Sequence, residues 1–146
     1  MKQLAALSVL ALMLSGCGQK TDVKDEAIGS CSSAQSQLVN EHISGQIDAL
    51  SKKDWDAAYS FASESFRKNV EIEQFILIIS NQYSMLVENQ GYKFGECTID
   101  ADKITQEVQV TSDEKVYYLT YRVSIIGSKL GIEAAVVGVK QTPTIV

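Results

Sequence analysis

The chain has 146 residues, with 13 Lys and Arg against 18 Asp and Glu and a formal net charge of −5. This length favours one domain, and the acidic balance argues against a nucleic-acid partner, because phosphate binding needs clustered Lys and Arg. The single histidine, His42, excludes sites with two or more histidine ligands, and no metal-ligand spacing or phosphate loop appears, so the sequence predicts no cofactor.

The N-terminal residues are typical of a processing signal. Lys2 is followed by an apolar run, residues 4–14, that is too short to span a bilayer core of about 30 Å as a helix. The run ends in Leu14-Ser15-Gly16-Cys17, which resembles the bacterial lipobox. The resemblance implies that residues 1–16 are a lipoprotein signal peptide and that Cys17 becomes acylated with diacylglycerol and a further chain such as palmitate. An ordinary secretory signal that contains a cysteine is the alternative.

A lipidated Cys17 predicts a protein held on a membrane, since each buried methylene contributes about 0.8 kcal/mol. Cleavage removes Lys2 and leaves a mature net charge of −6, so the domain itself is not expected to bind anionic lipid. Gly18 follows Cys17 where inner-membrane lipoproteins tend to have Asp. The resemblance therefore implies the outer membrane, facing the periplasm, rather than the inner membrane.

Two cysteines remain once Cys17 is acylated. Cys31 and Cys97 form an even pair in an oxidising compartment, which favours a disulfide bond. Such a bond would close a loop of about 66 residues and stabilise the domain by roughly 4 kcal/mol. Two free thiols are the alternative.

Helical patterning begins after a polar, non-periodic segment, residues 17–33, which we interpret as a flexible tether. Apolar residues then recur at helical spacing, with Gln46 off the stripe, and predict a first helix. Asp54 is expected to cap a second helix, which ends near residues 63–65. A third helix is expected over residues 71–83 and should be the most buried of the three. The apolar residues of the first helix are Val39, Ile43, Ile47 and Leu50.

Beyond Gly91 the apolar period changes from 3.6 to 2, which indicates strands. Strands are expected over residues 92–99, 104–111, 117–125 and 132–139, and the short turns between them predict an antiparallel meander. Helices first and strands afterwards is the pattern of an α+β fold. The predicted domain covers residues 34–141, and residues 142–146 form a C-terminal tail.

The segment Asp54-Trp55-Asp56-Ala57-Ala58-Tyr59, the third helix ending at Tyr83 and the following strands resemble the nuclear transport factor 2-like superfamily, over about residues 37–140. Uncharacterised bacterial branches are the most similar. The resemblance implies three helices packed on a curved antiparallel sheet of about four strands, shaped as a cone whose mouth can hold a ligand. It also implies that two copies can pair through the outer face of the sheet. Such a fold does not decide function.

Six residues are candidates for lining the cone, and each has a structural alternative. An acid beside a tyrosine could transfer protons as in isomerases of this shape, and only Glu133 offers such an acid. The structural alternative for Glu133 is an ordinary acid at the end of a strand. For the aromatic residues the structural alternative is packing in the core. His42 is interpreted as a partly exposed helix residue. The six candidates are Trp55, Tyr59, Phe75, Tyr117, Tyr121 and Glu133.

Two functions remain open. The favoured one is a non-enzymatic envelope lipoprotein that binds an unidentified small molecule or protein; the alternative is a small isomerase- or dehydratase-like enzyme that uses the cone. A cone filled by Phe75, Ile79 and Tyr121 favours the first. An enclosed cavity with Glu133 at its base favours the second.

Overall fold

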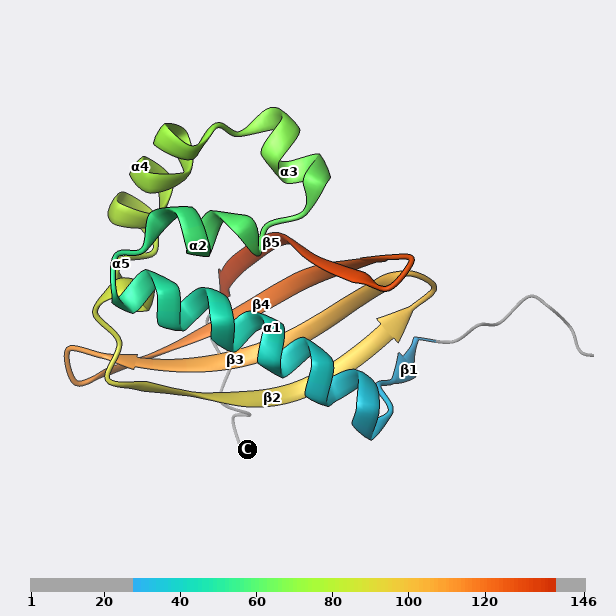
Figure 1. Ribbon diagram of the computed structural model, residues 1–146. Helices are drawn as coiled ribbons and strands as arrows, with labels where there is room; N and C mark the ends of the chain where they lie inside the picture. Colours follow the sequence, from blue (N-terminus) through green and yellow to red (C-terminus); the bar gives the residue numbers. More distant parts are fainter. Residues whose placement is uncertain (1–27, 139–146) are drawn as a thin grey trace, which may run out of the picture.

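The computed structural model describes residues 28–138 and has the α+β class expected from the sequence. All helical segments precede the main sheet in the chain and lie on one of its faces (Figure 1). The sheet has five strands and the helical half has five segments, against about four and three expected. The predicted signal peptide, Cys17, most of the tether and the predicted tail lie outside the described residues.

Helix α1, Ser33–Ser51, is the long helix that crosses the sheet. Ser32 caps it in a reciprocal capping box with Gln35, which satisfies two backbone donors of its first turn. Its apolar stripe is buried as expected, but Gln46 is buried too and was wrongly placed off that stripe. The buried residues of α1 are Val39, Ile43, Gln46, Ile47, Ala49 and Leu50.

Four short helices follow: α2 Trp55–Ser60, α3 Glu64–Asn69, α4 Ile72–Gln82 and α5 Ser84–Val87. Asp54 caps α2 as expected, because its side chain accepts a hydrogen bond from the backbone of Ala57. Helix α4 was expected to be the most buried and is not. It buries Phe75 and Ile79, whereas Leu77 is 61% exposed, because α4 packs on the domain through one side only.

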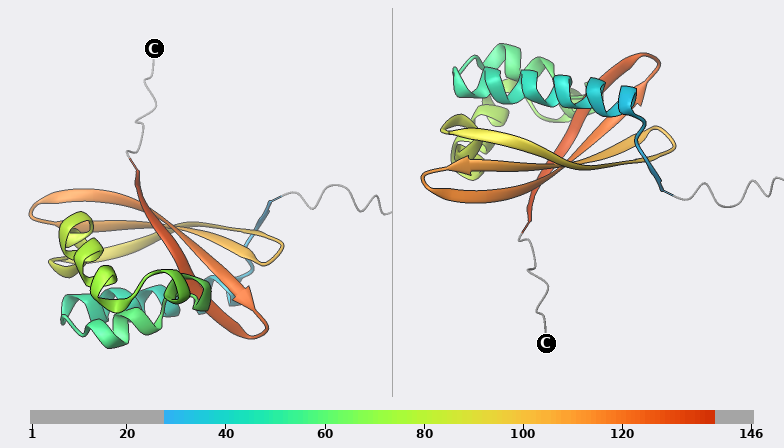
Figure 2. Two further views of the ribbon diagram at one scale, coloured as in Figure 1. Left: turned by 90° about the horizontal axis from the view of Figure 1, so that it is seen from above. Right: turned by 90° about the horizontal axis from the view of Figure 1, so that it is seen from below.

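The sheet is an antiparallel meander in the order β1-β2-β3-β4-β5, as the short turns predicted. Its strands are β1 Gly29–Ser30, β2 Gly91–Asp100, β3 Lys103–Ser112, β4 Lys115–Ile126 and β5 Lys129–Gly138. Asp113 and Glu114 join β3 to β4 with φ values of 49° and 59°. Positive φ at both central residues gives this turn a twist that matches the right-handed twist of the strands. The whole sheet is strongly twisted, so that β5 runs in a direction far from that of β2 (Figure 2).

Strand β1 and a disulfide bond fix the start of the domain to the sheet edge. Cys31 and Cys97 are bonded, with their Cα atoms 5.4 Å apart, which confirms the predicted pair. Next to them, Gly29 pairs with Ile99 and Ser30 with Thr98. The predicted tether is therefore too long at its end, because residues 29–33 belong to the fold.

The two faces of the sheet differ in chemistry, because side chains alternate along each strand. We call the face that carries the helices the inner face and the opposite one the outer face (Figures 1 and 2). The inner face is mostly apolar, while the outer face carries polar residues such as Glu107 and Thr120. The inner-face residues buried on β3 and β4 are Ile104, Gln106, Val108, Val110, Ser112, Leu119, Tyr121 and Val123.

Candidate functional site

A cavity of about 200 Å³ lies between the inner face and the helices. Helices α4 and α5 form one wall, and strands β4 and β5 form the other. Its lining is dominated by aliphatic and aromatic side chains, as in ligand pockets. The apolar and aromatic lining residues include Phe66, Phe75, Ile79, Leu86, Tyr121 and Ile132.

Tyr121 supplies the unusual polar atom of this cavity. The residue is fully buried at the centre of β4, and its hydroxyl has no hydrogen-bond partner among the described residues. Burial raises the pKa of the Tyr121 hydroxyl well above its usual value, so the group stays neutral, keeps its proton and can donate a hydrogen bond. An unpaired buried hydroxyl is costly, because it has lost its hydrogen bonds to water.

Other polar groups that line the cavity have partners. The hydroxyl of Tyr83 donates to the backbone carbonyl of Ala135, and Gln46 Nε2 donates to the carbonyl of Ala58 at 3.3 Å. Tyr121 therefore differs from Tyr83, which lines the same cavity. The Tyr121 side chain has no exposed surface, so a ligand in the cavity must displace neighbouring side chains slightly to reach its hydroxyl, which has no other partner among the described residues.

Gln106 is a second polar residue buried on the inner face. It stands opposite Tyr121 in the register of β3 and β4. Its Nε2 donates to the carbonyls of Gly95 and Glu96, at 3.1 and 3.3 Å, where β2 bulges. Its Oε1 is buried without a partner in the described part of the chain. The amide therefore supports the bulge.

The structure brings three of the six predicted candidates to the cavity: Phe75, Tyr121 and Glu133. Phe75 is 3% exposed and also packs on the rings of Tyr59 and Phe66, with centroids 5.5 and 6.2 Å away. Phe75 and Tyr121 therefore narrow the space under the helices.

Glu133 does not form the acid–tyrosine pair that an isomerase would need. Its Oε1 is 2.6 Å from Nζ of Lys103. The register between β4 and β5 shifts at this point, since Arg122 pairs with Ala134 and Val123 with Ile132. Glu133 is the extra residue of this bulge. Simple alternation along the strand predicted that its side chain points inward, but the bulge breaks the alternation and the carboxylate contacts Lys103 instead.

The other three candidates do not line the cavity. Trp55 and Tyr117 are half-buried and pack against the core. The Tyr59 hydroxyl donates to the carbonyl of Val70 at 2.6 Å, so it ties α2 to the end of α3. His42 Nε2 lies 2.9 Å from the carbonyl oxygen of Phe61, and the two rings meet edge to face. These contacts hold the helical layer together.

Residues that the sequence did not single out complete the cavity. The sequence placed Tyr83 on the apolar stripe at the end of the third helix but not in a ligand site, and Gln46 only as a polar residue off the stripe of the first helix. Helical spacing from Ile43 and Leu50 to Gln46 could have indicated burial of this amide. In residues 28–138 no group of three or more His, Cys, Asp or Glu side chains could hold a metal ion.

The fold and cavity define a small α+β domain whose helices cover one face of an antiparallel meander. Residues 32–140 match the family described as a domain of unknown function (DUF4864), and the chain belongs to this family. Comparison with curated proteins and with solved structures gives no match. Between residues 28 and 138, none of the helices has the length and hydropathy needed to cross a membrane.

Proposed function

We propose that this protein is a lipid-anchored envelope protein with a nuclear transport factor 2-like domain that binds a small molecule without catalysis. The lipobox-like residues ending in Cys17 support the anchor, and the Cys31–Cys97 bond fits an oxidising compartment such as the periplasm. The order of helices and strands, with α1 lying across the inner face, supports the fold family.

The observation that carries the binding function is the Tyr121 hydroxyl beside an apolar cavity, since no group in the described part of the chain forms a hydrogen bond with it. An apolar lining favours a ligand with little polar surface, and one neutral donor favours a single acceptor such as a carbonyl oxygen. The cavity of about 200 Å³ is below the range of drug-sized pockets, roughly 300–1,000 Å³, so the ligand is small.

Binding is favoured over proton transfer because the cavity offers no free acid–base pair. Among the residues of the described range 28–138 that line the cavity, the only carboxylate belongs to Glu133, and that group is paired with Lys103. A proton-transfer site needs a base within hydrogen-bond reach of the substrate and a donor for the developing charge. Tyr121 supplies only the donor.

The test uses two small ligands of nearly equal shape, acetophenone, which has a carbonyl oxygen, and ethylbenzene, which has none. The full chain should bind both, as judged by NMR titration or calorimetry, and should bind acetophenone at least about fivefold more tightly, because a net hydrogen bond contributes roughly 1 kcal/mol. Tyr121→Phe should abolish this preference while retaining affinity for ethylbenzene.

Tyr83→Phe is the matched control, because Tyr83 lines the same cavity but its hydroxyl already has a partner. This variant should keep the preference for acetophenone. If neither ligand binds, or if Tyr121→Phe and the original chain discriminate equally, the cavity is not the binding site that we propose.

A further inference from the structure

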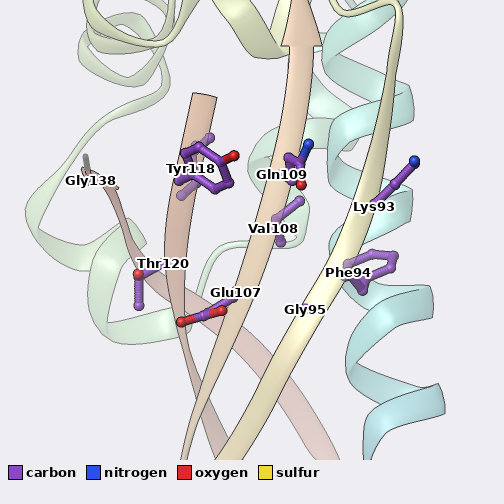
Figure 3. Close-up of a pocket in the computed structure, with 10 residues that line it drawn as sticks. Lys93, Phe94, Gly95, Glu107, Val108, Gln109, Tyr118, Thr120 and Gly138 are labelled. Carbon is purple, nitrogen blue, oxygen red and sulfur yellow. The ribbon is translucent and has the colours of Figure 1, made fainter. Parts of the chain in front are cut away.

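We propose that the outer face of the sheet carries a second binding site, a groove for a saccharide. The groove has a volume of about 230 Å³ and crosses strands β2 to β5 on the side without helices (Figure 3). It is separated from the Tyr121 cavity by the thickness of the sheet. The two sites therefore hold different ligands and can be tested independently.

Strand register builds the groove from two rows of side chains that run across the strands. In the first row Lys93 pairs with Gln109, and Gln109 pairs with Tyr118. In the second row Glu107 pairs with Thr120. These five side chains come from three strands and gather on one face (Figure 3), so a ligand lying across the strands meets all of them.

Two glycines keep the groove open. Gly138 ends the first row beside Tyr118. Gly95 lies in the bulge of β2, where a Cβ would be 3.1 Å from Glu107 Cβ and 3.2 Å from its Oε2. A side chain at either position would occupy space in or beside the groove, and at Gly95 it would displace the Glu107 side chain.

The lining groups specify the ligand by what they donate and accept. The Glu107 carboxylate only accepts hydrogen bonds and the Lys93 ammonium only donates them, while Gln109 and Thr120 do both. Within residues 28–138, Lys93 and Glu107 form no ion pair. A ligand that satisfies such neighbours must donate and accept at adjacent positions. Hydroxyl groups do this, and a saccharide presents several on one ring.

Tyr118 supplies an aromatic ring at the wall of the same groove (Figure 3). An aromatic ring packs well against the C–H face of a sugar ring, since it is apolar on its surface and polar only at its hydroxyl. A lipid fits poorly, because the groove is rich in polar groups. A polyanion fits poorly too, because the groove of this acidic chain has a single Lys among its lining residues and also a Glu.

The experiment uses the full chain, purified in a detergent that has no sugar headgroup. Di- and trisaccharides built from glucose, galactose, mannose and N-acetylglucosamine are titrated by calorimetry and NMR, and purified peptidoglycan is used in co-sedimentation. We expect saturable binding in at least one arm. Binding of free sugars alone indicates a soluble saccharide, and binding of peptidoglycan indicates a wall polymer.

Three variants test the site. Glu107→Gln keeps the shape but removes the charge and should weaken binding at least about tenfold. Gly138→Leu should abolish binding by filling the groove, and it is tolerated by the fold because the nearest atom to a Cβ there is the Tyr118 carbonyl oxygen at 3.8 Å. Thr105→Val, on the outer face of β3 but outside the groove, is the control and should bind normally.

Absence of binding in both arms would overturn the proposal, as would equal binding by the original chain and Glu107→Gln. If Gly138→Leu failed to fold, Glu107→Gln would still decide. A stable dimer that Gly138→Leu disrupts, without saccharide binding, would overturn the proposal in favour of self-association through this face. Tyr121→Phe should leave saccharide binding unchanged, so failure of one site is distinguishable from failure of the other.

Discussion

Replacing Tyr121 by Phe should stabilise the empty protein, which is unusual for a change at the centre of a core. The Tyr121 side chain is fully buried and its hydroxyl has no partner in the described residues. Leaving a buried polar group unsatisfied costs about 1–3 kcal/mol. Phe keeps the ring and its packing, so Tyr121→Phe should raise the free energy of unfolding by about 1–3 kcal/mol, with a rise in melting temperature of about 4 °C or more.

The same variant should change the response to alkaline pH. Burial raises the pKa of Tyr121 in the folded state, while an unfolded tyrosine titrates near pH 10. Below about pH 10 Tyr121 keeps its proton in both states, so this residue contributes no pH dependence to the stability. Above it the unfolded state loses the proton first, so the folded state is destabilised by up to about 1.4 kcal/mol per pH unit. Tyr121→Phe removes this contribution.

Urea unfolding followed by circular dichroism at pH 7 and pH 11 measures both effects. Tyr83→Phe is the control, because the Tyr83 hydroxyl donates to the Ala135 carbonyl and its loss should cost about 0.5–1.5 kcal/mol. If Tyr121→Phe were less stable than the original chain at pH 7, its hydroxyl would have a partner and the argument for a ligand donor would fail.

Three further changes have definite expected outcomes. Phe75→Ala should lower the free energy of unfolding by about 3–5 kcal/mol in urea titrations, because Phe75 is 3% exposed; a loss below about 1 kcal/mol would indicate an open pocket instead. Reduction of the Cys31–Cys97 bond, compared by calorimetry with the oxidised protein, should cost roughly 4 kcal/mol for a sequence separation of 66 residues, and an unchanged melting temperature would contradict this. Cys17→Ser should move the protein from the membrane pellet to the supernatant on fractionation, and a variant still sedimenting at high salt would contradict the lipid anchor.

Elements with strong periodicity could be predicted from the sequence. The four long strands were located within a few residues because apolar and polar side chains alternate along them, and Asp54 marked the start of α2 because its side chain suits a helix cap. Strand β1 could not be predicted, because two residues show no period. Its pairing with β2 lies next to the Cys31–Cys97 bond, which joins two segments that are far apart in the sequence.

The buried polar residues explain why the candidate site was predicted only in part. Gln46 and Gln106 occupy positions that helical and strand periods assign to the core, yet glutamine is usually exposed. For Glu133 the strand period predicted an inward side chain, and this prediction failed because a bulge breaks the alternation at that residue. Whether the Tyr121 hydroxyl has a partner depends on groups brought together from distant segments, which no local pattern encodes.

The alternation of the strands also separates the two proposed sites chemically. Along β4, Tyr121 faces the helices and is cut off from water, whereas Tyr118 and Thr120 face outward. A hydroxyl in the apolar cavity can discriminate strongly, because a competing ligand without an acceptor leaves it unpaired. The outer groups are only half-buried, so each contributes less and several must act together. The inner cavity is therefore suited to selective recognition of one small apolar molecule, and the outer groove to weaker binding of a ligand with many hydroxyl groups.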